Sequence, residues 1–312
     1  MSQPEKTGTC SVNNIENITF GVEIETTIPV SANVRIGMYH NGLPAVMATK
    51  ATGEAVRFPS FNGNYWKAEA DGSIRVHTVG HRACEFVSPI LKGEAGIAHL
   101  IEFVEFLRDL GAQVNLTCGL HIHVSAATAA GENDSAAYLE RLVRLVAFNS
   151  KALYAQTGTT SREKGCYCAP LGQQTREAIR RVKKSKRVAD AAAGPSRYHL
   201  LNLTNLPRTG TVEFRCFAAT LNTNKVLLHL FSVLALCIIA RTAKTPANWD
   251  NKPLTGTKAL TNFLKVRPMA RIVGSPIMTD RFSRMLAKAL EMGAKYDNAQ
   301  ARDDLHALTI NA

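Results

Sequence analysis

Three short stretches of this chain each place two ionisable side chains two residues apart, with apolar residues between them. They are Glu23 and Glu25, His121 and His123, and Glu213 and Arg215. Successive side chains of a β-strand point to opposite faces, so residues i and i+2 lie on one face. Each stretch therefore predicts a strand with one apolar face and one face that carries charge or imidazole. If the three strands share a sheet, their polar side chains form a site for metal ions and anions.

The length and composition are typical of a folded, soluble protein. The chain has 312 residues, enough for one large domain or two ordinary ones. Hydrophobic residues make up 46% of it and charged residues 20%, which are ordinary values for globular proteins. The formal net charge of +12 favours anionic partners such as nucleotides, acidic peptides or nucleic acid, without choosing among them.

Cysteine usage and hydropathy indicate a cytoplasmic protein without a membrane partner. The seven cysteines are odd in number and irregular in spacing, which argues against a disulfide framework and for a reducing compartment. Residues 1–17 lack the apolar segment of a signal peptide. The longest apolar run, Val226 to Ala240, is interrupted by His229 and Ser232 and is short for a membrane span. It predicts a buried helix.

The order of expected elements favours an α+β fold. Strands are expected at 20–28, 84–87, 114–124, 198–203 and 211–217, and helices at 96–110, 135–155, 175–193, 225–240 and 279–295. Because strands and helices do not alternate regularly, we expect a largely antiparallel sheet. Residues 1–17 are expected to be a flexible tail, 18–245 the main domain with a basic insert at 160–197, and 246–312 a helical C-terminal extension.

Each charged pair also has a plainer interpretation. Glutamate is a poor strand former, so Glu23 and Glu25 alone favour a solvent-exposed strand edge. Adjacent like charges are costly, however, unless a cation such as Mg²⁺ lies between them. Two histidines on one strand face chelate transition metals, although single histidines are commonly structural. Glu213 and Arg215 fit a weak surface ion pair, but the arginine fork also suits phosphate or carboxylate.

Other polar residues lie in or beside the expected strands. Glu85 opens an apolar strand, Asp71 begins an Asp-Gly turn, and Asn202 is the polar residue of an apolar run. An ordinary turn and a structural hydrogen bond are the plainer interpretations of Asp71 and Asn202. The basic stretch Arg176 to Arg187 favours a solvated helix face, the alternative being contact with nucleotide phosphates or an acidic peptide.

A series of motifs follows in order along the chain. It comprises Phe-Gly-Val-Glu-Ile-Glu from Phe20, Asp-Gly-Ser from Asp71, Glu-Phe-Val-Ser-Pro from Glu85, Cys-Gly-Leu-His-Ile-His-Val from Cys118, Tyr-His-Leu-Leu-Asn-Leu from Tyr198 and Thr-Val-Glu-Phe-Arg-Cys-Phe from Thr211. In order and completeness this series resembles the amidoligases, relatives of glutamine synthetase and glutamate–cysteine ligase in the carboxylate–amine ligase superfamily. The resemblance covers residues 18–240 and therefore most of the domain at 18–245.

The resemblance implies a fold and a set of metal ligands. The fold is a curved, mostly antiparallel sheet of the glutamine synthetase type, backed by helices. Glu23 and Glu25 would each supply a ligand to one of two Mg²⁺ ions, with Mn²⁺ as the alternative ion. Glu85 would add to one ion, and Glu213 with His121 or His123 would complete the other.

The resemblance also implies an activity. The protein would use ATP to activate a carboxylate as an acyl phosphate, which an amine substrate then attacks to form an amide on an amino acid, peptide or protein side chain. Arg215 would meet the transferred phosphoryl group, and Glu23 and His123 would share the nucleotide contacts. Asp71 and Asn202 are expected to be catalytic with Arg215. Relatives of glutamine synthetase can share sites between subunits, so a homo-oligomer is an open expectation.

Three alternatives stay open at this point. A zinc hydrolase would use His121, His123 and one glutamate around a water molecule, but it leaves the other glutamates and Arg215 unexplained. A non-catalytic protein that binds nucleic acid through its basic surface would leave all three strand pairs unexplained. A degenerate family member would bind nucleotide without forming an amide.

Overall fold

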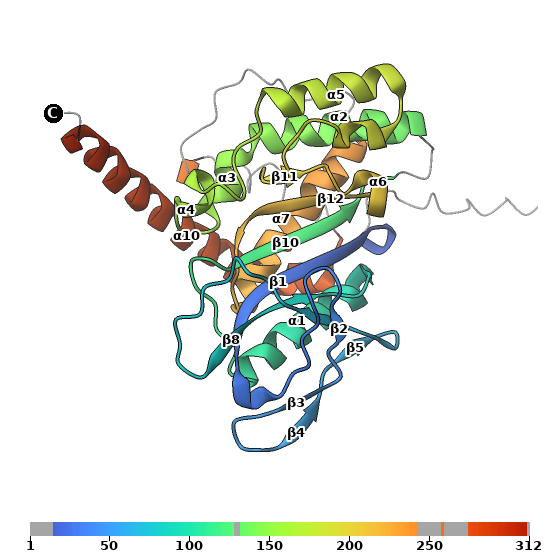
Figure 1. Ribbon diagram of the computed structural model, residues 1–312. Helices are drawn as coiled ribbons and strands as arrows, with labels where there is room; N and C mark the ends of the chain where they lie inside the picture. The colour runs from blue at the N-terminus through green and yellow to red at the C-terminus, as the bar shows by residue number, and fades with distance from the viewer. Residues whose placement is uncertain (1–14, 128–131, 243–256, 259–273, 311–312) are drawn as a thin grey trace, which may run out of the picture.

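An antiparallel sheet forms the centre of the molecule (Figure 1). The computed structural model describes residues 15–127, 132–242, 257–258 and 274–310. The 8-stranded sheet has the order β11-β12-β10-β1-β8-β7-β2, and β9 pairs with one end of β1. Its strands are β1 (Thr19–Pro29), β2 (Leu43–Pro44), β7 (Lys67–Glu69), β8 (His81–Val87), β9 (Leu91–Lys92), β10 (Gly119–Ser125), β11 (Leu201–Asn202) and β12 (Thr211–Ala218). The three strands with paired charges are therefore neighbours, in the order β12-β10-β1.

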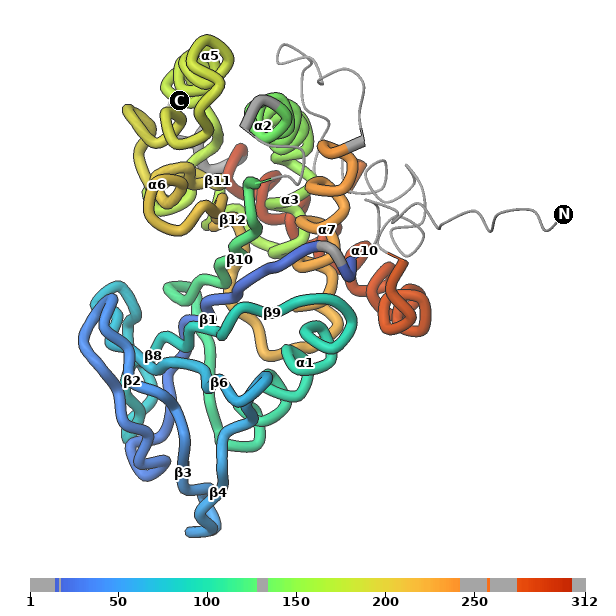
Figure 2. Tube along the Cα trace, turned by 90° about the vertical axis from the view of Figure 1, so that its right-hand side faces the viewer, coloured from blue at the N-terminus to red at the C-terminus, as the bar shows by residue number. Residues whose placement is uncertain are grey.

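Two small hairpins and a set of helices complete the fold. The hairpins are β3 (Met47–Thr49) with β4 (Ala55–Arg57) and β5 (Ser60–Phe61) with β6 (Asn64–Tyr65). The longer helices are α1 (Gly93–Asp109), α2 (Glu132–Phe148), α5 (Gln173–Ser185), α7 (Thr223–Thr242) and α10 (Pro276–Ile310), and the short ones are α3 (Ser150–Ala155), α4 (Ser161–Lys164) and α6 (Leu206–Thr209). Figure 2 shows α1, α7 and α10 on the same side of β1 and β10. One sheet face is thus covered by helices.

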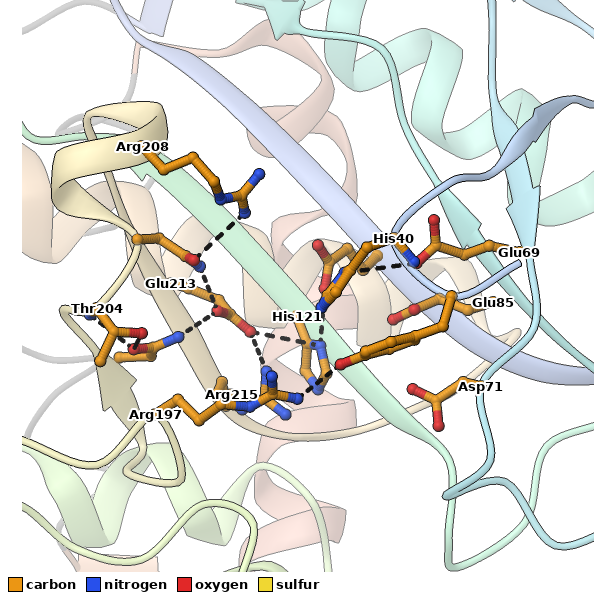
Figure 3. Close-up of a pocket in the computed structure, with 14 residues that line it drawn as sticks. His40, Glu69, Asp71, Glu85, His121, Arg197, Thr204, Arg208, Glu213 and Arg215 are labelled. Carbon is orange, nitrogen blue, oxygen red and sulfur yellow. Dashed lines mark hydrogen bonds and ion pairs between the residues drawn. The ribbon is translucent and has the colours of Figure 1, made fainter. Parts of the chain in front are cut away.

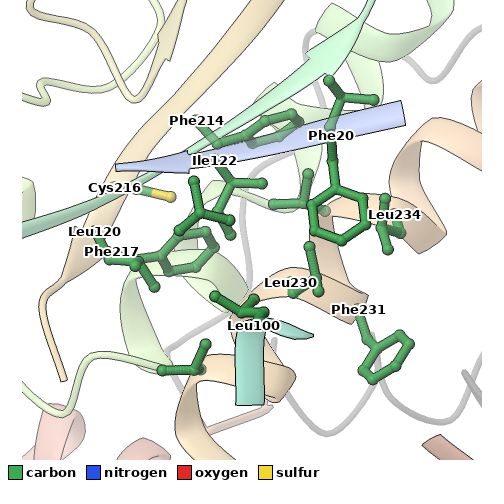
Figure 4. Packing of buried hydrophobic residues seen from close by; sticks show 14 of the residues in the cluster. Phe20, Leu100, Leu120, Ile122, Phe214, Cys216, Phe217, Leu230, Phe231 and Leu234 are labelled. Atoms are coloured by element: carbon green, nitrogen blue, oxygen red, sulfur yellow. The ribbon is translucent and has the colours of Figure 1, made fainter. Parts of the chain in front are cut away.

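The apolar core lies between this face and the helices. Because side chains alternate along a strand, Phe20 and Ile122 point toward α1 and α7 while the ionisable residues point the other way. Figure 4 shows Phe20, Ile122 and Phe214 of the sheet beside Leu100 of α1 and Leu230 of α7. Each such buried side chain contributes about 1.5–3 kcal/mol. The apolar half of each strand therefore fixes the sheet, and the polar half is held out of the core.

The α+β architecture with an antiparallel sheet backed by helices, expected from the sequence, is confirmed. The strand expected at 20–28 and the helix expected at 96–110 correspond to β1 and α1. The helix expected over 175–193 is wrong beyond 185, because Lys186 adopts the left-handed conformation (φ 64) and ends α5. The last helix is longer than expected, and the chain at 135–155 divides into α2 and α3. The expected domain limits stay predictions, and the expected tail at 1–17 lies largely outside the described residues.

The most apolar helix belongs to the core. Within α7, the segment Thr223–Arg241 is long and apolar enough to cross a membrane, yet 83% of its most apolar window is buried inside the protein. It contacts α2 and α10 on one side and β10 on another. The buried helix expected over Val226 to Ala240 is therefore confirmed.

Candidate active site

A row of glutamates crosses three neighbouring strands on the polar face. Glu25 of β1 lies opposite Glu85 of β8, and Glu85 lies opposite Glu69 of β7. All three are buried, at 5%, 4% and 6% exposure. Asp71 follows β7, and one carboxylate oxygen from each of Glu25, Asp71 and Glu85 lies within 4.8 Å of the other two. We call Glu25, Glu69, Asp71 and Glu85 the acidic half of the site.

The ionised form of Glu85 is costly in this setting. Burial raises the pKa of its carboxyl group from the usual 4.5 to about 10, and the charges of Glu23, Glu25 and Asp71 add to this rise. A group with this pKa is neutral at pH 7. A divalent cation would offset the repulsion among the carboxylates and favour the ionised form. The acidic half therefore fits a hard cation with oxygen ligands.

Glu213 and Arg215 lie on the other side of the site, with His121 between them and the acidic half (Figure 3). Nδ1 of His121 lies 3.0 Å from Oε2 of Glu23 and 3.5 Å from Oε1 of Glu213. Nε2 of His123 lies 3.0 Å from Oε1 of Glu23. We call Glu23, His123, Glu213 and Arg215 the balanced half, because each carboxylate here faces a group that carries or accepts a positive charge. His121 lies between the two halves.

The pKa shifts in the balanced half run opposite to that of Glu85. Burial would raise the pKa of Glu23, but His123 and His121 hold it well below its usual value. Burial also opposes the lowered pKa of Glu213, which His121, Arg215 and His123 cause. The pKa of His123 is raised despite its burial, because Glu23 favours its charged form. This half keeps its carboxylates ionised with its own side chains.

A β-bulge in β12 removes Phe217 from the face that carries Arg215. Between two registered pairs of β10 and β12, β10 contributes one residue and β12 two, so Arg215 and Cys216 together face His121. The extra residue places Cys216 and Phe217 in the core while Glu213 and Arg215 stay on the polar face. Bulges commonly re-aim side chains in this way. Strict alternation would have left Phe217 on the same face as the arginine.

Glu213 is fixed by several donors. It forms an ion pair with Arg215. Nδ2 of Asn202 and Nδ2 of Asn205 both donate hydrogen bonds to its Oε2, at 2.7 and 2.8 Å. Nε of Arg215 also donates to the carbonyl oxygen of Tyr167 at 3.4 Å. The amide of Asn202 is thus occupied in holding Glu213.

The backbone of Gly119 lies where three site side chains meet. Its N–H donates a hydrogen bond of 2.6 Å to Oε2 of Glu25. A Cβ at this position would lie 2.8 Å from Nε2 of His121, 3.0 Å from Nη2 of Arg162 and 3.4 Å from Glu25. Only glycine allows this close approach without moving them. The glycine at the start of β10 therefore has a role in the site.

Among the described residues, three of the cavities lie on the polar face. The central one has a volume of about 410 Å³ and is lined by residues of both halves. A cavity of about 520 Å³ adjoins it on the side of Asp71, Arg162 and Tyr167. A cavity of about 390 Å³ lies at the start of β1, beside His123 and the apolar side chain of Ile90. These volumes suit small ligands.

The structure brings together the site residues predicted from the sequence. The central cavity is lined by Glu23, Asp71, Glu85, His121, Asn202, Glu213 and Arg215, while Glu25 and His123 line the adjoining cavities. Their roles stay predictions. Two of the groups that could hold a metal ion contain Glu23. One combines it with Glu85 and His121, and the other with His123 and Glu213. Among the described residues, no such group contains both histidines. A zinc site built on the two histidines gains no support.

Sequence reasoning missed several residues that line these cavities. Glu69 is one, although Glu69 and Asp71 repeat the two-residue spacing of the other pairs and that signal could have found it. Arg162 and Arg197 are others, and they come from segments that carry no such pattern. The basic residues of α5 line none of the three cavities, and Lys183 reaches Glu140 instead, at 3.8 Å. This supports the solvated helix face.

Comparisons with known proteins point to one family. A family model described as "Putative amidoligase enzyme" matches residues 16–236. A search of curated proteins gives no match. A solved structure titled a novel glutamine synthase homolog is 12% identical with a TM-score of 0.43, covering 91% of this chain and 66% of that chain. A bifunctional glutathione synthetase from Pasteurella multocida is 10% identical with a TM-score of 0.47, covering 95% of this chain and 50% of that chain. The chain thus spans only part of the length of each.

Proposed function

This chain belongs to the amidoligase family, and we propose that it is an ATP-dependent ligase that joins a carboxylate to an amine. The acid or amine is carried by an amino acid, a peptide or a protein side chain, and the reaction takes place in the cytoplasm. The observation that carries this proposal is the convergence of acidic, imidazole and guanidinium groups from β1, β8, β10 and β12 on one cavity. Such a set suits chemistry on densely charged phosphates.

The donor set fits two divalent cations, Mg²⁺ with Mn²⁺ as the alternative. Glu25, Asp71 and Glu85 would hold one ion. Glu23 with Glu213 and a histidine would hold the other, and both His121 and His123 lie within reach of Glu23. When bound, such ions neutralise phosphate oxygens and align the nucleotide. The close approach of one carboxylate oxygen from each of Glu25, Asp71 and Glu85, all within 4.8 Å of one another, is the feature of this chain that supports the fit.

The reaction would proceed through an acyl phosphate. A carboxylate is a poor electrophile toward an amine, and transfer of the ATP γ-phosphoryl group to its oxygen makes phosphate the leaving group. Arg215 faces the central cavity with its guanidinium held by Glu213 and by the carbonyl of Tyr167. A fixed guanidinium favours the negative charge that develops during phosphoryl transfer. We therefore assign Arg215 to the transferred phosphoryl group.

Two further residues take different roles. Asp71 lies on the rim shared by the central cavity and the 520 Å³ cavity, where its carboxylate would attract the ammonium group of the amine substrate in addition to its place beside the ion. Asn202 acts through Glu213, whose carboxylate it holds by a hydrogen bond of 2.7 Å. In our proposal Asn202 is a positioning residue, and its predicted catalytic role is replaced by this one.

Phosphate release from ATP tests the proposal. The purified protein with Mg²⁺ should release phosphate only when both an acid and an amine are supplied from pools of amino acids and peptides. Glu25→Gln keeps the size of the side chain and should lower the rate by about 100-fold or more, because it removes a charged ligand. Lys184→Gln, on the exposed face of α5, is the matched control and should leave the rate unchanged. If the protein binds ATP but releases no phosphate with any pool of substrates, the proposed ligase activity is wrong and the protein only binds nucleotide.

A further inference from the structure

The 520 Å³ cavity carries an excess of arginine, and we call it the arginine chamber. It is lined by Arg75, Arg162, Arg197 and Arg215. Arg215 is paired with Glu213. The other three form no ion pair with any residue in the described part of the chain. Three guanidinium groups without counter-ions repel one another and favour a bound anion.

Arg162 is the most informative of the three. It is only 8% exposed, and its Nη2 donates a hydrogen bond of 2.6 Å to the carbonyl oxygen of Arg215. Its Nε is buried and has no hydrogen-bond partner. A buried guanidinium with an unused donor is costly unless a ligand completes it. Arg162 therefore brings a largely buried guanidinium without an ion-pair partner among the described residues to the wall of the chamber.

Aromatic side chains orient the second arginine. Nη2 of Arg197 donates a hydrogen bond of 2.7 Å to the hydroxyl of Tyr39. The guanidinium carbon of Arg197 lies 5.1 Å from the ring centre of Tyr198, and that ring meets Tyr167 edge-on at 5.5 Å. Stacking of this kind holds the planar fork in place. Arg197 is thus arranged before any ligand arrives.

The third arginine is held through its backbone. The N–H of Arg75 donates to Oγ1 of Thr117 at 2.9 Å, and its carbonyl accepts from Nδ2 of Asn115 at 2.7 Å. Its side chain is exposed and lines the chamber, where it can contact a ligand. The opposite end of the chamber is lined by Glu25 and Asp71 and opens to the central cavity. One end is thus positive and the other negative.

We propose that the arginine chamber binds a carboxylate that does not react, carried by one of the two substrates, and that Arg75, Arg162 and Arg197 select it. This inference rests on the proposed ligase activity for what happens at the negative end. Charge-assisted bonds from a guanidinium fork to a carboxylate give both orientation and affinity. The selected substrate is then either an acid with a second carboxylate or an amine that is itself an amino acid.

Binding without turnover provides the first test. Calorimetry with glutarate, its monoamide and glutaramide, in the absence of ATP and Mg²⁺, compares ligands with two, one and no carboxylates. Affinity should fall along this series. Arg75→Gln and Arg197→Gln should each lower the affinity for glutarate by about 10- to 100-fold. Arg162→Lys keeps the positive charge without the guanidinium fork, and it should also lower this affinity. Lys184→Gln is the control on α5. Equal affinity for all three ligands would overturn the proposal, as would unchanged binding in the arginine variants.

Steady-state kinetics then separate the two sources of the carboxylate. One arm holds methylamine constant and compares glutarate with butyrate as the acid. The other holds butyrate constant and compares glycine with glycinamide as the amine. Arg75→Gln and Arg197→Gln should raise the KM of the carboxylate-bearing partner in one arm and leave the KM of ATP unchanged. A raised KM for ATP, or displacement of glutarate by inorganic phosphate at lower concentration, would assign the chamber to phosphate and overturn the proposal.

The two proposals fail in different ways. In one outcome, glutarate binds through the arginines while phosphate release from ATP is absent with every combination of acid and amine. This outcome would refute the ligase activity and support carboxylate binding in the arginine chamber. If phosphate release requires both substrates and the arginine variants change neither KM nor glutarate binding, the chamber is refuted while the ligase stands.

Discussion

The two halves of the site solve the same electrostatic problem in different ways. In the balanced half, Glu23 and Glu213 keep a lowered pKa because His121, His123 and Arg215 lie against them. In the acidic half, Glu85 lies between Glu25 and Glu69 with no cationic side chain in register, and its pKa rises to about 10. The balanced half therefore neutralises its carboxylates with its own side chains, whereas Glu85 in the acidic half requires a bound proton or an added cation.

This difference suggests that the two halves have different roles in the site. A half that balances its own charges holds its geometry whether or not ligands are bound, which suits the positioning of a phosphoryl group. In the acidic half, His121 lies 3.6 Å from Glu25 and His40 lies 4.0 Å from Glu69, whereas no ion pair reaches Glu85 from the described residues. This half should therefore change with cation binding and tie its stability to the cation. The following predictions test this difference from the largest effect to the smallest.

The largest effect is expected from breaking the balanced half. Arg215→Ala removes the guanidinium that is paired with the buried Glu213, and removing one partner of a buried pair costs about 3–5 kcal/mol. Urea unfolding should show this loss, and phosphate release should fall with it. Arg215→Lys keeps a charge without the fork, so it should recover much of the stability and less of the rate. An Arg215→Ala protein as stable as the unsubstituted chain would show that the histidines alone balance this half.

The acidic half should respond to pH and cations in the opposite sense. The carboxyl of Glu85 loses its proton near pH 4.5 when unfolded and near pH 10 when folded, so its contribution lowers the stability of the cation-free protein as pH rises through this interval. The lowered pKa values of Glu23 and Glu213 instead give stability that is lost as pH falls through their folded-state pKa values, below 4.5.

Thermal unfolding at several pH values, with EDTA or with Mg²⁺, measures this contrast. Mg²⁺ at 100 times its Kd should add about 2.7 kcal/mol and flatten the decline between pH 5 and pH 9. Glu85→Gln should remove most of both effects. If the unsubstituted protein and Glu85→Gln respond alike to pH and to Mg²⁺, the acidic half does not hold the ion.

A smaller effect is expected at the junction of the halves. Gly119→Ala would place a methyl group against His121, Arg162 and Glu25, and overpacking of this kind costs about 1–3 kcal/mol. Stability should fall by that amount, with a loss of phosphate release because side chains of both halves move. Gly172→Ala is the matched control, since nothing lies within 4 Å of its Cβ. Equal behaviour of the two variants would mean that the junction tolerates displacement.

The smallest effect is expected from Asn202→Ala. It removes one of two amide donors to Oε2 of Glu213 and leaves Asn205 in place. The loss of one such hydrogen bond costs about 1 kcal/mol, so stability and rate should each fall slightly. The double change with Asn205→Ala should cost more than the sum of the single changes, because Oε2 of Glu213 then loses both of its amide donors while only Oε1 keeps its ion pair with Arg215. A large loss of rate in Asn202→Ala alone, at unchanged stability, would restore the catalytic role expected from the sequence.

The sequence by itself determined which residues share a strand face. The two-residue spacing of Glu23 with Glu25 and of His121 with His123 follows from the local geometry of a strand, which holds wherever that strand lies. The apolar residues between them decided which face is buried, and the ordered motifs indicated the family. The chemical character of the site residues and the strand face on which each of them lies could therefore be predicted from the sequence.

Only the tertiary structure decided which groups meet. The register that lines up Glu25, Glu85 and Glu69 depends on which strands become neighbours, and this depends on packing across the whole core rather than on local periodicity. The bulge after Arg215 ends the alternation of β12 and turns Phe217 into the core, which the spacing of Glu213 and Arg215 did not predict. Arg162 of the short helix α4 and Arg197 of a loop reach the site from segments without a repeating pattern, because such segments are placed by contacts distant in sequence.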